Sequence, residues 1–273
     1  MKASKRFRTP AKLELKDADA AATPLCAADH DGHGAKHDKA TAKQLHRRIA
    51  VLQEMLYAER DRKVLVVLQG VDCAGKDGTV HQLFRKINPM GLDAARFDVP
   101  TSNEIAHDYL WRVHQQVPRS GQIAVFNRSH YEDVLHPFVY GQLDPAALEQ
   151  RYAQIRDFER MLAETGTVIL KIFLHISKDE QRARLQARLD DPEKHWKFDP
   201  ADLKHRERWD DFHRAYEKAI AETDTPHAPW YIVPADAKPH RDLAVATLLV
   251  EALEDMDLRW PSGDPALKKL KVR

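Results

Sequence analysis

The sequence predicts an α/β fold in three layers, with a central parallel sheet between two layers of helices. Residues 64–69 read Val-Leu-Val-Val-Leu-Gln, a continuous apolar run that is typical of a parallel strand buried on both faces. Apolar segments of strand length then alternate with segments of helical periodicity along most of the chain. This alternation favours a parallel sheet, because helices provide the crossovers between parallel strands.

These patterns predict the elements in chain order. A helix over residues 41–60 precedes the first strand, because Leu45, Ile49, Leu52 and Leu56 recur at helical spacing. Further strands are expected at residues 96–99, 122–126, 167–175 and 230–233. Further helices are expected at residues 78–87, 103–116, 145–164, 178–189, 201–222 and 238–256. The apolar faces near 45–57 and 238–256 suit either the core or a subunit interface.

The chain divides into three expected parts. Residues 1–40 have weak periodicity and many Ala, Asp and His residues, which favours a flexible arm. Residues 41–260 form one domain, and residues 261–273 form a basic tail. In the arm, the histidine-rich stretch 30–38 offers metal ligands. A solvated polar segment is the favoured interpretation there, because no rigid element is expected to fix the ligand geometry.

Composition narrows the class of protein. The 43 basic residues balance 42 acidic ones, and the net charge of +1 argues against a dedicated nucleic-acid-binding protein. No apolar run approaches the roughly 18 residues of a membrane-spanning helix. No apolar stretch follows the basic N-terminus, so a secretory signal is not expected. The two cysteines, Cys26 and Cys73, show no CxxC spacing, and a reduced, cytoplasmic location is the expectation.

A glycine-rich phosphate loop follows the first strand. Residues 70–79 contain the Gly-x4-Gly-Lys pattern of a P-loop, between a buried strand and a helix. Backbone N–H groups at the helix N-terminus attract anions, and the Lys76 ammonium can follow a transferring phosphoryl group. The expected phosphate-binding residues of this loop are Gly70, Ala74, Gly75, Lys76, Asp77, Gly78 and Thr79.

Two acids distinguish this loop from the common P-loop pattern. Asp77 stands where a magnesium-binding Ser or Thr usually follows the lysine, and Asp72 lies inside the loop. Two carboxylates would repel a phosphate unless a cation lay between them, so a divalent metal ion held partly by Asp72 is expected. The alternative is that Asp77 binds no ligand, and that an acid stands in the first helical turn because the helix dipole stabilises it there.

A second polar cluster follows the strand at 122–126. Arg128 comes at the carboxyl end of that strand, where it can stabilise charge on a transferring phosphoryl group. Asn127 occupies the position of the usual Walker B acid, and its alternative role is to cap the next helix. The acids of this cluster follow later, as Glu132 and Asp133.

Several motifs together resemble the family-2 polyphosphate kinases. They are Gly-Lys-Asp-Gly-Thr at 75–79, Pro-Thr at 100–101 before His-Asp-Tyr-Leu-Trp at 107–111, residues 127–135, Trp-Lys-Phe at 196–198 and Arg-Trp-Asp-Asp at 208–211. The resemblance covers residues 45–257. It implies a thymidylate-kinase-like fold with a helical lid, and magnesium-dependent phosphoryl transfer between inorganic polyphosphate and nucleotides.

The resemblance also implies roles for individual residues. Asp72 matches a magnesium ligand and candidate base, Lys76 the phosphate-binding lysine, and Arg128 the arginine after the second strand. Asn127 replaces an aspartate of many members, a form that resembles the subgroup phosphorylating both AMP and ADP. Nucleotide contacts are therefore expected from Asn127, Glu132 and Asp133. Adenine nucleotides are the expected acceptors, with guanine nucleotides as an alternative. Mg²⁺ is the expected metal ion, with Mn²⁺ as an alternative. The protein is expected to form a homo-oligomer (dimer or tetramer).

The lid is expected at residues 178–214, where ten Lys/Arg and ten Asp/Glu residues alternate. A solvated helix pair with salt bridges explains such a pattern. Arg184 and Arg188, however, lie four residues apart on one helical face and match lid arginines of the family, so phosphate contacts are expected from both. Two rival functions remain open: an ATP-dependent nucleoside monophosphate kinase, and a non-catalytic polyphosphate- or nucleotide-binding regulator.

Overall fold

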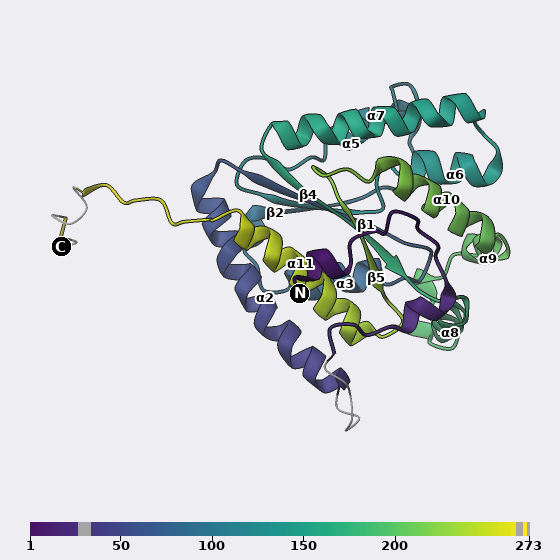
Figure 1. The fold of residues 1–273 in the computed structure, drawn as a ribbon, viewed down its shortest axis with the longest axis horizontal. Coiled ribbons are helices and arrows are strands. Elements are labelled where there is room, and N and C mark those ends of the chain that lie inside the picture. The colour runs from purple at the N-terminus through teal and green to yellow at the C-terminus, as the bar shows by residue number, and fades with distance from the viewer. Residues whose placement is uncertain (27–33, 266–269, 272–273) are drawn as a thin grey trace.

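The computed structural model describes residues 1–26, 34–265 and 270–271 of the chain. Five parallel strands form one sheet in the order β2-β3-β1-β4-β5 (Figure 1). The strands are β1 (Lys63–Gln69), β2 (Leu92–Arg96), β3 (Ile123–Asn127), β4 (Thr167–His175) and β5 (Trp230–Pro234). Because β1 lies between β3 and β4, and β1 and β3 are parallel neighbours, the segments that follow β1 and β3 meet at the carboxyl ends of the strands.

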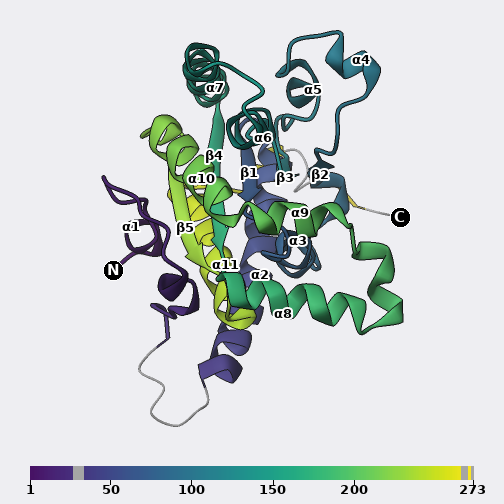
Figure 2. The same ribbon diagram turned by 90° about the vertical axis from the view of Figure 1, so that its right-hand side faces the viewer.

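Helices cover both faces of the sheet, as Figure 2 shows. The principal helices are α2 (Gly34–Glu59), α3 (Lys76–Phe84), α6 (Glu132–Tyr140), α7 (Pro145–Glu164), α8 (Lys178–Leu189), α9 (Ala201–Glu207), α10 (Trp209–Thr223) and α11 (Lys238–Asp255). One apolar core joins α2, α3 and α11 to the sheet, and a second joins α6, α7 and α10 to its other face. The three-layer α/β prediction is confirmed.

The layer of α2 and α11 settles one open alternative. Leu52 and Leu56 of α2 and Leu249 and Leu253 of α11 are all buried in the same core. The apolar faces that suited either core or subunit interface therefore build the core. They give no support to the expected homo-oligomer, which stays a prediction.

Four elements differ from the expectation. The strand expected at 96–99 is β2, which ends at Arg96. The start of this edge strand was not predicted because its Asp-Ala-Ala stretch is only weakly apolar. The helix expected at 103–116 is two short helices, α4 (Ser102–Ile105) and α5 (Trp111–His114). The helix expected at 201–222 is broken at Arg208 into α9 and α10. Helix α6 was not predicted, and it contains Pro137.

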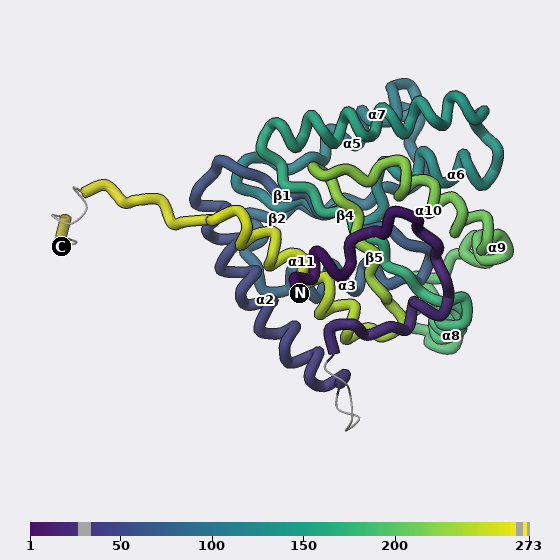
Figure 3. Tube along the Cα trace, viewed as in Figure 1, coloured from purple at the N-terminus to yellow at the C-terminus, as the bar shows by residue number. Residues whose placement is uncertain are grey.

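The N-terminal segment packs on the domain, although a flexible arm was expected. It contains α1 (Ala3–Arg6) and the 3₁₀ helix η1 (Asp17–Ala21), and it runs beside β5 and α11 (Figure 3). Phe7 is buried, and its carbonyl oxygen accepts a hydrogen bond of 2.8 Å from the backbone of Ile232. The few apolar residues of this segment thus suffice to fix it, which weak periodicity did not reveal.

Two expected features lie partly outside the described residues. His30 and His33 of the histidine-rich stretch do so, as do Lys268, Lys269 and Arg273 of the basic tail. The stretch from 259 to 264 is without regular structure and extends away from the domain (Figure 3). In the described part of the chain, no helix combines the length and apolar character needed to cross a membrane.

Candidate active site

The phosphate loop connects the end of β1 to the start of α3. Gly75 has φ +103° and is the N-terminal cap of α3, and a Cβ atom there would lie 2.0 Å from the Arg241 guanidinium. Gly70 has φ +152°, and a Cβ atom there would lie 2.7 Å from the carbonyl oxygen of Leu174. Both positions therefore require glycine, so that the loop can curl around an anion at the helix N-terminus.

Lys76 lies under the loop and is only 8% exposed. Its ammonium group donates hydrogen bonds to the carbonyl oxygens of Gly70 (2.6 Å) and Val71 (3.2 Å). Burial lowers its pKa, and nearby Arg128 adds to this effect while Asp72 opposes it. The lysine thus holds the loop closed, with an ammonium that can exchange these carbonyls for phosphate oxygens.

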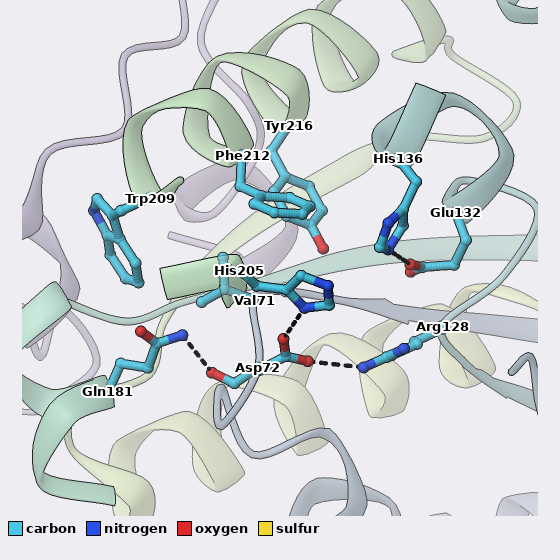
Figure 4. A pocket seen from close by; sticks show the side chains of 11 residues that line it. Val71, Asp72, Arg128, Glu132, His136, Gln181, His205, Trp209, Phe212 and Tyr216 are labelled. Atoms are coloured by element: carbon cyan, nitrogen blue, oxygen red, sulfur yellow. Dashed lines mark hydrogen bonds and ion pairs between the residues drawn. The ribbon is translucent and has the colours of Figure 1, made fainter. Parts of the chain in front are cut away.

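Asp72 is the centre of the polar network in Figure 4. One carboxylate oxygen accepts a hydrogen bond of 2.7 Å from Arg128, and the other lies 2.7 Å from Nδ1 of His205. Burial disfavours the charge of Asp72, but His205, Lys76 and Arg128 outweigh burial and hold the pKa of the carboxyl well below its usual range. Asp72 is therefore an anion at neutral pH.

The backbone is strained where this network is built. Arg128 has φ +63° and Cys73 has φ +66°, in the left-handed region that residues other than glycine rarely adopt. Each such residue costs about 1–3 kcal/mol and persists where surrounding contacts enforce it, most often at functional sites. The turn after β3 is enforced by a hydrogen bond from the Arg128 backbone to Leu68 of β1. In this strained backbone conformation, the Arg128 side chain reaches Asp72.

The other residues expected after β3 have different surroundings. The Asn127 amide donates a hydrogen bond to Asp77, so these two line the cleft as a pair. Glu132 lies 3.3 Å from His136 and borders the cavity beside Arg128. Asp133 lies outside both cavities and forms an ion pair of 3.2 Å with Arg112. The structure thus brings Asn127 and Glu132 to the site, whereas Asp133 holds Arg112.

The two lid arginines differ in how they are engaged. Arg184 of α8 donates hydrogen bonds to the carbonyl oxygens of Cys73 and Ala74 in the loop, and to those of Ala235 and Asp236 after β5. Its guanidinium fastens the loop from outside. Arg188 makes only a hydrogen bond to Lys197 and an ion pair of 3.2 Å with Asp202.

Two cavities adjoin the loop. A small one of about 30 Å³ lies between Asp72, Arg128 and the aromatic side chains of α10 (Figure 4). A cleft of about 1030 Å³ extends from Lys76 to the lid and is lined by nine Lys/Arg and six Asp/Glu residues. Of the expected loop residues, Ala74 and Thr79 line neither cavity, and the Thr79 hydroxyl instead donates to the Gly75 carbonyl. The cleft thus combines a large volume with more basic than acidic side chains, which suits a polyanion.

Sequence reasoning missed three residues of the site. His205 and Asp202 lie three apart on one face of α9, which presents both side chains to Asp72. That spacing was visible in the sequence, but the two side chains reach Asp72 only because the lid folds over the loop. Arg241 lies in the first turn of α11 and lines the cleft beside Gly75. No motif marked it.

The residues fit a divalent cation. Ligand atoms of Asp72, Asp202 and His205 lie within 4.8 Å of one another. Burial and the neighbouring charge of Asp72 raise the pKa of Asp202 to about 6. Two adjacent carboxylates, one of them reluctant to ionise, suit a divalent cation, because its charge would offset theirs.

Solved structures and curated relatives resemble the chain over most of its length. The crystal structure of polyphosphate kinase 2 from Arthrobacter aurescens TC1 has a TM-score of 0.91 and 42% sequence identity, and the match covers 98% of this chain and 95% of that one. The AMP/ADP-polyphosphate phosphotransferase of Meiothermus ruber is 54% identical over 228 residues, which are 84% of this chain and 85% of the relative. The ADP-polyphosphate phosphotransferase of Rhodopseudomonas palustris is 42% identical over 81% of each chain.

A family model reaches the same result from the sequence pattern. Residues 33–261 match the model described as polyphosphate kinase 2 (PPK2). This range contains the loop, the turn after β3 and the lid that form the cleft. The resemblance noted in the motifs is confirmed, and the chain belongs to the polyphosphate kinase 2 family.

Proposed function

We propose that this protein transfers a phosphoryl group between inorganic polyphosphate and AMP or ADP, forming ADP or ATP. The observation that carries the proposal is the cleft of about 1030 Å³, in which one phosphate loop continues into a surface with nine Lys/Arg residues. A mononucleotide alone would not use so many cations. Relatives named for transfer between polyphosphate and AMP/ADP or ADP support the same substrates.

The residues of the site can perform the transfer by positioning and charge neutralisation. Phosphoryl transfer spreads negative charge over the oxygens of the moving group, and fixed cations lower the energy of that state. Lys76 and Arg128 approach it from two adjacent strands. Arg184 acts indirectly, because its hydrogen bonds to the carbonyl oxygens of Cys73 and Ala74 hold the loop backbone before α3 in place.

We infer an electrostatic role for Asp72 and not that of a general base. A group whose pKa lies well below its usual range accepts protons poorly at neutral pH. The acceptor does not require a base, because a terminal phosphate has its second pKa at about 6 and is largely ionised already. Asp72 therefore orients Arg128 and attracts a cation, in line with the family role of a magnesium ligand.

Mg²⁺ is the proposed cofactor, held by Asp72 and Asp202 together with substrate phosphates. The ion would supply charge neutralisation between phosphates and carboxylates. His205 approaches the same oxygen atoms of Asp72, and its pKa is raised by that contact. The imidazole thus shields Asp72 in the structure described here, and can give way to a cation.

One experiment tests the function. Purified protein is incubated with Mg²⁺, either AMP or ADP, and either polyphosphate or ATP as the donor, and the nucleotides are separated by chromatography. We expect ADP and ATP to form with polyphosphate. Product that forms from AMP with ATP as the donor, and not with polyphosphate, would identify a nucleoside monophosphate kinase. Binding of polyphosphate without any product would identify a regulator, and either result would overturn the proposal.

A further inference from the structure

A second group of metal-ligating side chains lies apart from the phosphate cleft. It unites Cys26 of the N-terminal segment, Asp38 of α2 and His240 in the first turn of α11. The Cys26 thiol donates to both carboxylate oxygens of Asp38, at 3.1 and 3.0 Å, and Nδ1 of His240 lies 3.3 Å from the same carboxylate. All three ligand atoms lie within 4.8 Å of one another. Three distant segments of the chain thus place one sulfur, one oxygen and one nitrogen around a common point.

Two of the three ligating side chains are buried. Asp38 and His240 are each only 1% exposed. Among the described residues, Nε2 of His240 is buried without a hydrogen-bond partner, although Nδ1 faces Asp38. The exposed His37 lies 3.9 Å from the Asp38 carboxylate. A buried carboxylate is costly unless it is paired or coordinates a metal ion.

The ligand types select the ion. Mg²⁺ prefers oxygen ligands, but a thiolate, an imidazole and a carboxylate are the ligands that Zn²⁺ takes in a tetrahedral site. We propose that Cys26, Asp38 and His240 bind a Zn²⁺ ion, with a water molecule as the fourth ligand. Binding deprotonates the thiol, and the proton leaves to solvent.

The position of the site gives the ion a structural effect. Asp38 belongs to the histidine-rich stretch, where the lack of a rigid element argued against a metal site. Helix α2 begins at Gly34, however, so Asp38 is held on a helix. His240 directly precedes Arg241, which lines the phosphate cleft beside Gly75. The ion would therefore tie the N-terminal segment to the start of α11, next to the loop.

Cobalt substitution tests the site without reference to activity. The full-length protein is freed of metal with a chelator, and Co²⁺ is added in increments while the absorption spectrum is recorded. We expect visible bands of tetrahedral Co²⁺ and a near-ultraviolet thiolate-to-metal band that saturate at about one equivalent. Zn²⁺ should then displace the Co²⁺ and abolish both bands. A protein with no sulfur band at any Co²⁺ level would overturn the proposal.

Variants assign the band to this cluster. Cys26→Ser should abolish the sulfur band, and His240→Gln should weaken Zn²⁺ binding by at least about tenfold, the lower limit of losses for perturbing such sites. Two controls should keep the band: Cys73→Ser, which removes the other cysteine, and Asp202→Asn, which alters the cluster in the cleft. Circular dichroism of each metal-free variant checks its fold. A band that survives Cys26→Ser in folded protein would contradict the assignment.

Discussion

Two carboxylates lie in ion clusters of different design: Glu159 is fully buried, and Asp72 is only partly buried. Glu159 is fully enclosed, and it accepts hydrogen bonds from Lys171 at 2.6 Å and from Tyr131 at 2.8 Å. Its pKa is lowered although burial opposes the charge, because Lys171 and His130 outweigh burial. Asp72 lies at the mouth of a cleft, where its neighbour Asp202 has a raised pKa. In the enclosed cluster the carboxylate is paired with the ammonium of Lys171, whereas the carboxylates of the cleft cluster face the cleft.

The difference separates support from function. The enclosed cluster lies directly behind the turn after β3, because His130 and Tyr131 follow Arg128 by two and three positions. The contacts of Glu159 with His130 and Tyr131 fix the backbone that carries Arg128. The cleft cluster instead keeps groups whose present partners are replaceable, such as the Lys76 ammonium on loop carbonyls. A polar network that is complete stabilises a fold, and one that is incomplete can bind a ligand.

The largest expected effect comes from Lys76→Ala. Loss of the one lysine in the loop should lower turnover by about 10³-fold, as expected for removal of a charge that stabilises the transferring group. The melting temperature should change little, since the lysine forms no ion pair with a carboxylate. ATP formation from ADP and polyphosphate measures turnover, and calorimetry measures the melting temperature. Retention of activity in this variant would be incompatible with the proposed mechanism.

The enclosed cluster should respond in the opposite manner. Lys171→Met leaves Glu159 buried without its cation and should lower the free energy of unfolding by about 3–5 kcal/mol. The fraction that remains folded should keep turnover near that of the wild type, because Lys171 does not line the cleft. Urea unfolding and activity per folded molecule test both parts. A stable but inactive variant would place Lys171 in the function and remove the distinction.

Salt should weaken the binding of polyphosphate more than the binding of ADP. Polyphosphate that neutralises several Lys/Arg side chains releases counterions when it binds, by analogy with nucleic acids. The KM for polyphosphate should therefore rise by about tenfold between about 50 and 200 mM salt. The KM for ADP, with fewer charges, should rise less. Initial rates at several salt concentrations give both constants, and equal slopes would argue against a binding surface for a phosphate chain.

The sequence predicted the parts of the site that local patterns encode. Gly75 and Lys76 follow a buried strand, and Arg128 follows the next central strand, so their convergence was predictable from a parallel sheet. The roles of Arg184 and His205 were not. Arg184 was expected at phosphate but is saturated by backbone carbonyls, because packing of α8 on the loop decides what its guanidinium reaches. His205 acquires a role only when the lid folds over Asp72, a contact between residues 133 positions apart.

Protonation of Asp202 should make the stability of the protein depend on pH. The pKa of Asp202 is raised to about 6, so the folded protein binds its proton more tightly than the unfolded chain does. The resulting stabilisation is complete below about pH 4 and is lost as the pH rises through about 6. Above that, the ionised carboxylate costs about 3 kcal/mol when no cation is bound.

Asp202→Asn removes this cost. In the presence of a chelator at about pH 7.5, the variant should melt about 6–12 °C above the wild type, and the difference should vanish near pH 4. Saturating Mg²⁺ should stabilise the wild type more than the variant, and so narrow the difference at neutral pH. A variant that is less stable than the wild type in chelator would mean that the ion pair of Asp202 with Arg188 already completes the cluster. The contrast with Glu159 would then fail.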